Sequence, residues 1–140
     1  NWDTHFNNFH VLKNDLLPHL DTGMSTLFRD LHDRGMLETT LVLVTGEFGR
    51  TPRINKDAGR DHWGPSTAIA VGGGGIRGGV VVGASNERAE KPATTPYGPE
   101  DLAATLYHCL GIDPKTEFHT PEGRPIPIVP GSGRLIEGLT

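Results

Sequence analysis

Three short segments of this sequence each contain an acidic residue close to a histidine or an arginine, a combination that could bind an ion. They are Trp2-Asp3-Thr4-His5, Gly46-Glu47-Phe48-Gly49-Arg50 and Arg60-Asp61-His62-Trp63. Carboxylates combined with imidazoles suit zinc or manganese, whereas carboxylates alone suit magnesium or calcium. We therefore predict one divalent-metal site, whose candidate ligands are Asp3, His5, Glu47, Asp61 and His62.

Each candidate ligand also has an ordinary structural reading. Asp3 and His5 are two residues apart, so on an extended segment both side chains point to the same side. Acidic and polar side chains in a terminal loop also cap turns. Glu47 could be an exposed acid paired to Arg50, and His62 could stack on its neighbouring tryptophan. The sequence leaves both readings open at each position.

Arg50 is the candidate residue for binding an anion. Its planar guanidinium group fits the oxygens of a phosphate or sulfate, although such arginines more often form structural salt bridges. The glycine run 72–75 could also cradle a phosphate through its backbone amides. That run lacks the lysine and Ser/Thr of a P-loop, and no helix is expected after it, so a tight turn is the favoured reading.

Two helices are expected around these segments. Apolar residues recur at helical spacing over residues 16–31, and Gly35 is placed to end that helix. Pro18 is expected to kink the helix or to mark a restart in its first turn. A second helix is predicted over residues 99–110, because a proline and two acids open it and Gly111 follows it.

Continuous apolar runs predict buried strands over residues 40–45 and 67–71, with a short third strand over residues 79–83. Apolar and polar residues do not alternate in these runs, which indicates an α/β fold whose sheet is covered on both faces. Glu47 then follows the carboxyl end of a strand, where open α/β sheets bind ligands. The proline-rich residues 114–130 are expected to form short extended segments.

Composition limits the other classes of function. With 140 residues the chain is long enough for one domain with a core. Its net charge of −4 argues against general binding to nucleic acid or anionic membranes. No apolar run approaches the roughly 20 residues that a membrane span needs. Because the chain begins at Asn1, not Met, we expect it to be the carboxyl-terminal portion of a longer protein.

These motifs resemble one bacterial family of exported proteins, the domain of unknown function 1501 family. The resemblance covers essentially the whole chain, and it is carried by residues 2–5, 33–35, 46–52, 59–63, 73–76 and 101–106. That family is similar to the alkaline phosphatase/sulfatase superfamily, whose members hydrolyse phosphate or sulfate esters with one or two metal ions. The resemblance implies a periplasmic or otherwise exported protein. It also implies a partial three-layer α/β sheet with flanking helices, in which residues 1–140 are the carboxyl-terminal part of one sulfatase-like domain.

The resemblance also implies roles for individual residues. Asp3 and His5 resemble the first metal-binding pair of the superfamily, and His62 resembles a later metal histidine. Glu47 stands where the superfamily has a strand-end Asp-His pair. Its neighbour is Phe48 where a histidine is expected, so that ligand is lost or is supplied by Asp61 instead.

The function implied is metal-assisted hydrolysis of a small-molecule or polysaccharide ester that is anionic, with Arg50 steadying the anion. The superfamily's nucleophile lies upstream of this sequence, so we expect the chain by itself to be catalytically silent. The alternative is a non-catalytic exported module that keeps the fold and at most a structural cation. A third reading, a nucleotide binder, needs a helix directly after Gly75, and the apolar residues 80–82 argue against it.

Overall fold

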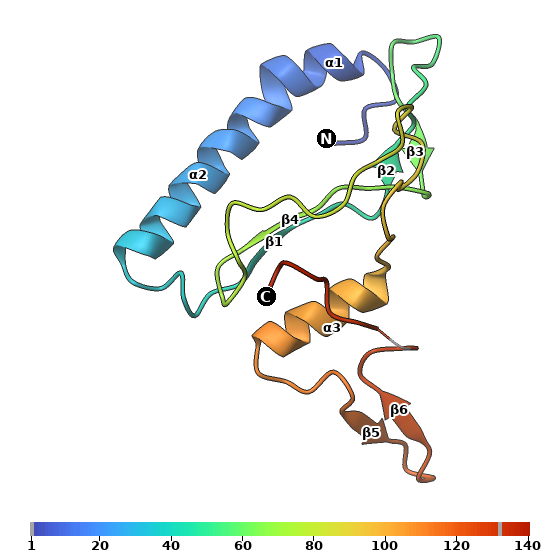
Figure 1. Ribbon diagram of the computed structural model, residues 1–140. Coiled ribbons are helices and arrows are strands. Elements are labelled where there is room, and N and C mark those ends of the chain that lie inside the picture. The colour runs from blue at the N-terminus through green and yellow to red at the C-terminus, as the bar shows by residue number, and fades with distance from the viewer. Residues whose placement is uncertain (1, 132) are drawn as a thin grey trace.

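The computed structural model describes residues 2–131 and 133–140 and shows a mixed α/β chain (Figure 1). Its first large element is a long helical rod with three parts in sequence: α1 (Asn8–Val11), a π-helical turn η1 (Leu12–Leu16) and α2 (Leu17–Asp33). None of the described helices is long and apolar enough to cross a membrane.

The π-helical turn explains how the rod passes Pro18. In a regular α-helix the proline ring collides with the carbonyl group four residues earlier, that of Asn14, and it offers no N–H to that carbonyl. The turn η1 widens the backbone just ahead of the proline, so the helix continues instead of ending. The helix thus begins well before residue 16. Its predicted end is confirmed, because Gly35 has the left-handed φ of 67°.

The strands β1 (Val42–Val44) and β4 (Ala70–Gly72) form an antiparallel ladder in which Leu43 pairs with Val71. In Figure 1 the helical rod runs alongside this ladder. Both strands are shorter than the apolar runs that predicted them. Leu43 in β1 is 37% exposed, so the described residues do not cover both faces of the ladder.

A second ladder joins β2 (Gly49–Arg50) to β3 (His62–Trp63), with Arg50 opposite His62. The chain between these strands forms a loop, residues 51–61, which lies next to the amino-terminal segment. This short ladder therefore brings two of the candidate site residues side by side.

The predicted third strand over residues 79–83 is wrong. Gly79 and Gly83 both have positive φ angles, 74° and 83°, which extended strands do not adopt. Val81 between them is 94% exposed, so its apolar side chain is not buried against any described element. In the glycine run 72–75, Gly72 ends β4 and residues 73–75 form a tight turn, as expected, with no helix directly after it.

The helix α3 (Pro99–Cys109) confirms the second predicted helix, and Gly111 follows it with a φ of 73°. Beyond it, β5 (Glu117–His119) and β6 (Pro125–Pro127) pair as a hairpin within the proline-rich tail. Figure 1 shows this hairpin projecting away from the rest of the chain beyond α3.

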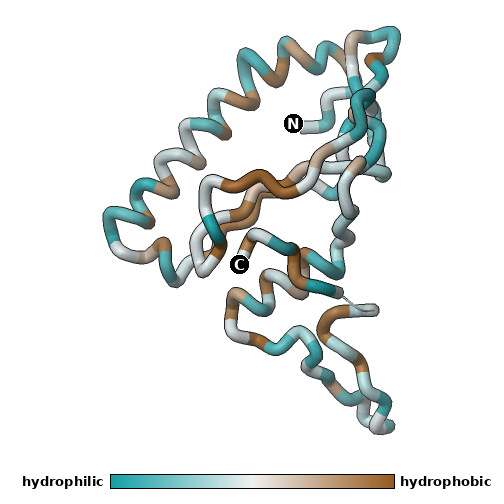
Figure 2. Tube along the Cα trace, viewed as in Figure 1, coloured by the Kyte–Doolittle hydropathy of each residue, from teal (hydrophilic) through white to brown (hydrophobic). Residues whose placement is uncertain are grey.

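The buried apolar core of the described chain is small, and its members are Leu31, Ala104, Val129 and Ile136. The accessible surface is 10016 Å², whereas a compact monomer of this mass exposes about 7,100 Å². Figure 2 shows hydrophobic stretches running along β1 and β4, in the middle of the view. Much apolar surface that a compact domain buries is therefore open here.

Candidate metal centre

The amino-terminal segment lies directly against the loop between β2 and β3. The backbone N–H of Arg60 donates to the carbonyl of Thr4 (3.2 Å), and that of Asn8 donates to the carbonyl of Ala58 (2.9 Å). Gly59 lies where the two segments come closest, because a Cβ atom there would overlap the carbonyl oxygen of His5. The close approach positions His5 beside the β2–β3 ladder.

Asn55 organises the loop from inside. Its Oδ1 accepts hydrogen bonds from the backbone N–H groups of Asp57 (3.0 Å) and Gly59 (2.9 Å). Its Nδ2 donates to the carbonyl oxygen of His5 (2.9 Å) and to Oδ1 of Asp61 (3.2 Å). One amide side chain thus ties the loop, the amino-terminal segment and an acidic residue together. Asparagine followed by Lys-Asp-Ala-Gly is a typical turn pattern, and this pattern is the signal by which the sequence could have revealed Asn55.

Three potential ligand atoms converge at this junction: Oδ1 of Asp3, Nε2 of His5 and Nε2 of His62. The Asp3 oxygen lies 3.0 Å from the His5 nitrogen and 2.9 Å from the His62 nitrogen, and the two nitrogens are 3.2 Å apart. Bonds of about 2.0–2.2 Å to a cation place neighbouring ligand atoms about 2.8–3.6 Å apart in tetrahedral or octahedral sites. The three atoms therefore have the spacing of one face of a coordination shell.

The charge state of Asp3 also suits a ligand. Hydrogen bonds from His62 and then Arg50 lower the pKa of its carboxyl group to about 2, so it is ionised at neutral pH. Two imidazoles with one carboxylate favour zinc, manganese or iron over magnesium and calcium, which prefer oxygen ligands. Asp3, His5 and His62 together form a potential metal-binding triad, and it is partly open to solvent.

Arg50 contacts this triad through Asp3. Its Nη2 lies 2.7 Å from Oδ1 of Asp3 and also donates to the carbonyl of Trp2 (3.0 Å). Its Nη1 donates to the carbonyl of Arg60 (3.2 Å). The guanidinium group is therefore fixed by two backbone carbonyls at the edge of the triad, and a carboxylate of the site is its ion-pair partner.

Asp61 and Phe48 each contact one histidine of the triad. Oδ1 of Asp61 lies 2.6 Å from Nδ1 of His5, on the nitrogen that does not face the other ligands. This hydrogen bond lowers the pKa of the Asp61 carboxyl group. The ring of Phe48 lies 4.0 Å from that of His62, centroid to centroid, so the predicted stacking partner of His62 is replaced by a different aromatic residue.

Glu47 is the candidate that the structure does not bring into the triad. It is exposed in the bend that precedes β2, and among the described residues its carboxylate does not belong to the converging group. It does not pair with Arg50 either, whose carboxylate partner is Asp3. Its neighbour Phe48, in the same bend, contacts His62 of the triad instead.

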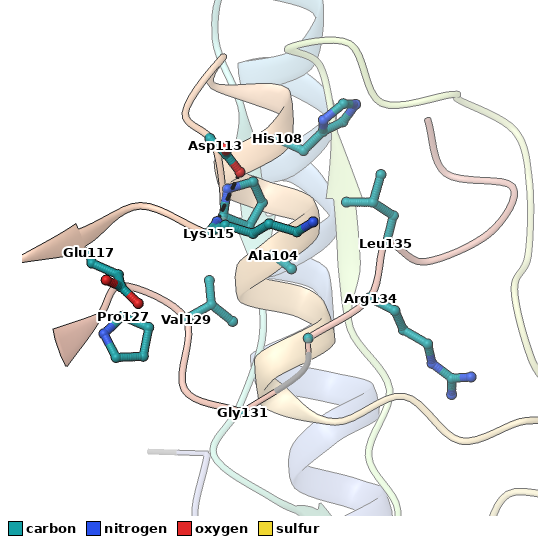
Figure 3. Close-up of a pocket in the computed structure, with 12 residues that line it drawn as sticks. Ala104, His108, Asp113, Lys115, Glu117, Pro127, Val129, Gly131, Arg134 and Leu135 are labelled. Atoms are coloured by element: carbon teal, nitrogen blue, oxygen red, sulfur yellow. Dashed lines mark hydrogen bonds between the residues drawn. The ribbon is translucent and has the colours of Figure 1, made fainter. Parts of the chain in front are cut away.

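A separate concavity of about 700 Å³ lies between α3, the β5–β6 hairpin, Gly131 and residues 133–135. In Figure 3 the side chain of Lys115 extends over Ala104, whereas Arg134 points away from it. No member of the triad lines this cavity, so it is distinct from the candidate metal centre.

Comparison with known proteins places the chain in a family. No curated protein and no solved structure matches it at a significant level. The family model described as protein of unknown function (DUF1501) matches residues 1–140. Since the match spans the whole sequence, the chain belongs to the DUF1501 family.

Proposed function

We propose that this protein binds a divalent cation through Asp3, His5 and His62 and uses it to hydrolyse phosphate or sulfate esters. The observation that carries the proposal is the meeting of two imidazole nitrogens and one carboxylate oxygen, all within 3.2 Å of one another. His5 and His62 come from segments far apart in the sequence. If these side chains only capped local turns, their ring nitrogens would have no reason to lie next to each other.

The openness of the triad favours catalysis over a purely structural site. Three protein ligands leave further coordination positions for water or a substrate oxygen. The side chains of Asp3, His5 and His62 are 40–48% exposed, so a substrate has access to them. A divalent cation held there supplies Lewis-acid polarisation of the ester and activation of the attacking group.

Arg50 is suited to orient an anionic ester beside the triad. Its two backbone carbonyl partners hold the plane of its guanidinium group in place. A phosphate or sulfate group that approached the triad would meet this cation at the position where Arg50 now contacts Asp3. The expected substrates are small-molecule or polysaccharide esters that carry such a group.

We also propose that the chain is the carboxyl-terminal part of a larger exported domain with a three-layer sulfatase-like sheet. The excess of accessible surface and the half-exposed β1–β4 ladder support this view, because both leave apolar faces that further strands and helices would cover. The nucleophile of such an enzyme is expected in that additional portion.

The alternative is a non-catalytic module with at most a structural cation, and a cation at the triad would join two segments that are remote in the sequence. The nucleophile does not separate the two functions. The hydroxyl of Thr51, next to the site, is held between the carbonyl of Arg53 and the backbone N–H of Asp61, so it is not activated, and a hydrolase would draw its nucleophile from the additional portion.

Metal analysis of the full-length protein, coupled to a screen of phosphate and sulfate esters, separates these functions. We expect about one cation per triad, lost in Asp3→Ala and His62→Ala but retained in Asp57→Asn. Asp57 is the matched control because its exposed carboxylate lies on the same loop and pairs only with Lys56 among the described residues. Metal with turnover supports the hydrolase, metal without turnover on any ester supports the module with a structural cation, and absence of metal contradicts the hydrolase and the cation site.

A further inference from the structure

We infer that Asp61 is a positioning residue and not itself a ligand. It holds His5 in the tautomer that carries its proton on Nδ1, so that the unprotonated Nε2 faces the cation site. The inference rests on the proposed metal site and assigns one residue its role there. It also separates two roles that the sequence pattern cannot distinguish, because an acid next to a metal histidine can serve either.

A hydrogen bond joins the carboxylate of Asp61 to the imidazole of His5. Neutral imidazole has one N–H and one bare nitrogen, and an ionised carboxylate only accepts hydrogen bonds. Both ring nitrogens of His5 approach a carboxylate oxygen, and the contact of Nδ1 with Oδ1 of Asp61 (2.6 Å) is shorter than that of Nε2 with Oδ1 of Asp3 (3.0 Å), so we assign the proton of the neutral ring to Nδ1. Nε2 is then bare, and it is the nitrogen that faces Asp3 and His62.

Asp61 lies beside the triad and not within it. Its carboxylate contacts the edge of the His5 ring opposite to the one that enters the triad, and it does not belong to the converging group of described residues. The same oxygen, Oδ1, also accepts from Nδ2 of Asn55 (3.2 Å). An oxygen that already accepts two hydrogen bonds is engaged in orienting its neighbours.

Asp61 is itself held in place by hydrogen bonds to Thr51 and Asn55. Its carbonyl accepts from the backbone N–H of Thr51 (2.9 Å), and its own N–H donates to Oγ1 of the same threonine (3.0 Å). Asn55 holds both the Asp61 carboxylate and the His5 carbonyl. The imidazole of His5 is thus oriented by a network that needs no cation. Metal-binding histidines commonly donate their second N–H to a carboxylate, which raises their basicity and fixes their orientation.

The test measures Zn²⁺ affinity and stoichiometry in the full-length protein by competition with a chromophoric chelator. We expect Asp61→Ala to weaken binding by about 10–100-fold while one ion still binds. Asp61→Asn should weaken it by several-fold, because its amide oxygen accepts the same hydrogen bond without the charge. Asp57→Asn should match the wild type, and Asp3→Ala should lose the stoichiometric ion.

A second measurement reads the tautomer directly. In the metal-free protein, ¹⁵N NMR of the histidine rings should show His5 with its proton on Nδ1, and Asp61→Asn should increase the population with the proton on Nε2. This variant keeps the shape of the side chain and serves where Asp61→Ala fails to fold.

Two results overturn the inference. If Asp61→Ala or Asp61→Asn loses the ion as completely as Asp3→Ala does, Asp61 is a ligand. If Asp61→Asn leaves both the affinity and the His5 tautomer unchanged, Asp61 has no positioning role. Failure of the proposed function can be distinguished from failure of this inference. If the wild type binds Zn²⁺ but cleaves no ester, only the proposed hydrolase activity is contradicted. A wild type that binds no Zn²⁺ removes the metal site, and the tautomer measurement then still decides whether Asp61 orients His5.

Discussion

Phe48 packs its ring against His62, with centroids 4.0 Å apart and planes inclined by 33°. The phenyl ring restricts the orientations that the His62 imidazole can adopt at the candidate metal centre.

Removing this ring should weaken cation binding without removing a ligand. We expect Phe48→Ala to lower the Zn²⁺ affinity by about tenfold, because His62 gains rotameric freedom that binding must then remove. The matched control is Phe118→Ala, which removes an exposed ring from β5. Chelator competition on both variants measures the difference, and equal affinities would show that the Phe48 ring does not position His62.

Replacing Arg50 with lysine should separate substrate binding from metal binding. A single ammonium group cannot reach Asp3 and both backbone carbonyls with the planar geometry of a guanidinium group. We expect Arg50→Lys to keep the metal content and to reduce ester turnover, mainly through a higher KM for the anionic substrate. Metal content by mass spectrometry and steady-state kinetics test this, and unchanged kinetics would leave Arg50 with a structural role only.

Removal of the cation should loosen one specific junction. Asp3 and His5 come from the amino-terminal segment and His62 from β3, so a cation closes a long loop between them. On chelation, amide hydrogen exchange should rise at Asn7, Asn8 and Arg60, whose N–H groups bridge the two segments. The Ile128 amide, which bonds to Thr116, should keep its rate. A rise that is uniform along the chain would contradict a local role for the cation.

The carboxyl-terminal segment should detach from α3 in acid. Asp101 accepts hydrogen bonds from the backbone N–H groups of Arg134 and Gly98, and these bonds lower the pKa of its carboxyl group below the usual 3.8. A lowered pKa in the folded state contributes stability that is complete above pH 3.8 and is lost as the pH falls through the lowered pKa. NMR shifts of the Arg134 and Ile136 amides should follow this loss.

The substitution Asp101→Asn tests the same contact at neutral pH. We expect it to reduce the free energy of unfolding by about 1–3 kcal/mol, because buried hydrogen bonds to a charged acceptor are weakened. It should also flatten the pH dependence between the lowered pKa and pH 3.8. Asp33→Asn, an exposed change at the end of α2, is the control. An unchanged acid transition in Asp101→Asn would assign that transition to other groups.

The elements that local sequence determines could be predicted. Proline and acids at its start with glycine after its end determine α3, and Gly35 ends the long helix for the same reason. The segment 79–83 was mispredicted because a strand needs a partner, and its apolar residues carry no information about whether one is present. Family membership was also predicted correctly, since it depends on motifs and not on packing.

The site was predictable in part for a similar reason. The types and spacing of Asp3, His5 and His62 indicated ligands, and the structure brings them together. The exposed position of Glu47 depends on how the bend before β2 turns, which its neighbours in sequence do not determine. The contact between Asp61 and Nδ1 of His5 joins residues 56 positions apart, so no local pattern distinguishes it from ligation.

Gly59 gives this site an unusual sensitivity to mutation. It has no functional group, yet any side chain at this position would displace the backbone that carries His5. In a mutational scan, Gly59→Ala should therefore be tolerated as poorly as loss of a ligand, whereas exposed charged residues on the same loop should accept many replacements. The lack of space at Gly59 should then restrict substitution at this site as strongly as the need for ligand side chains does.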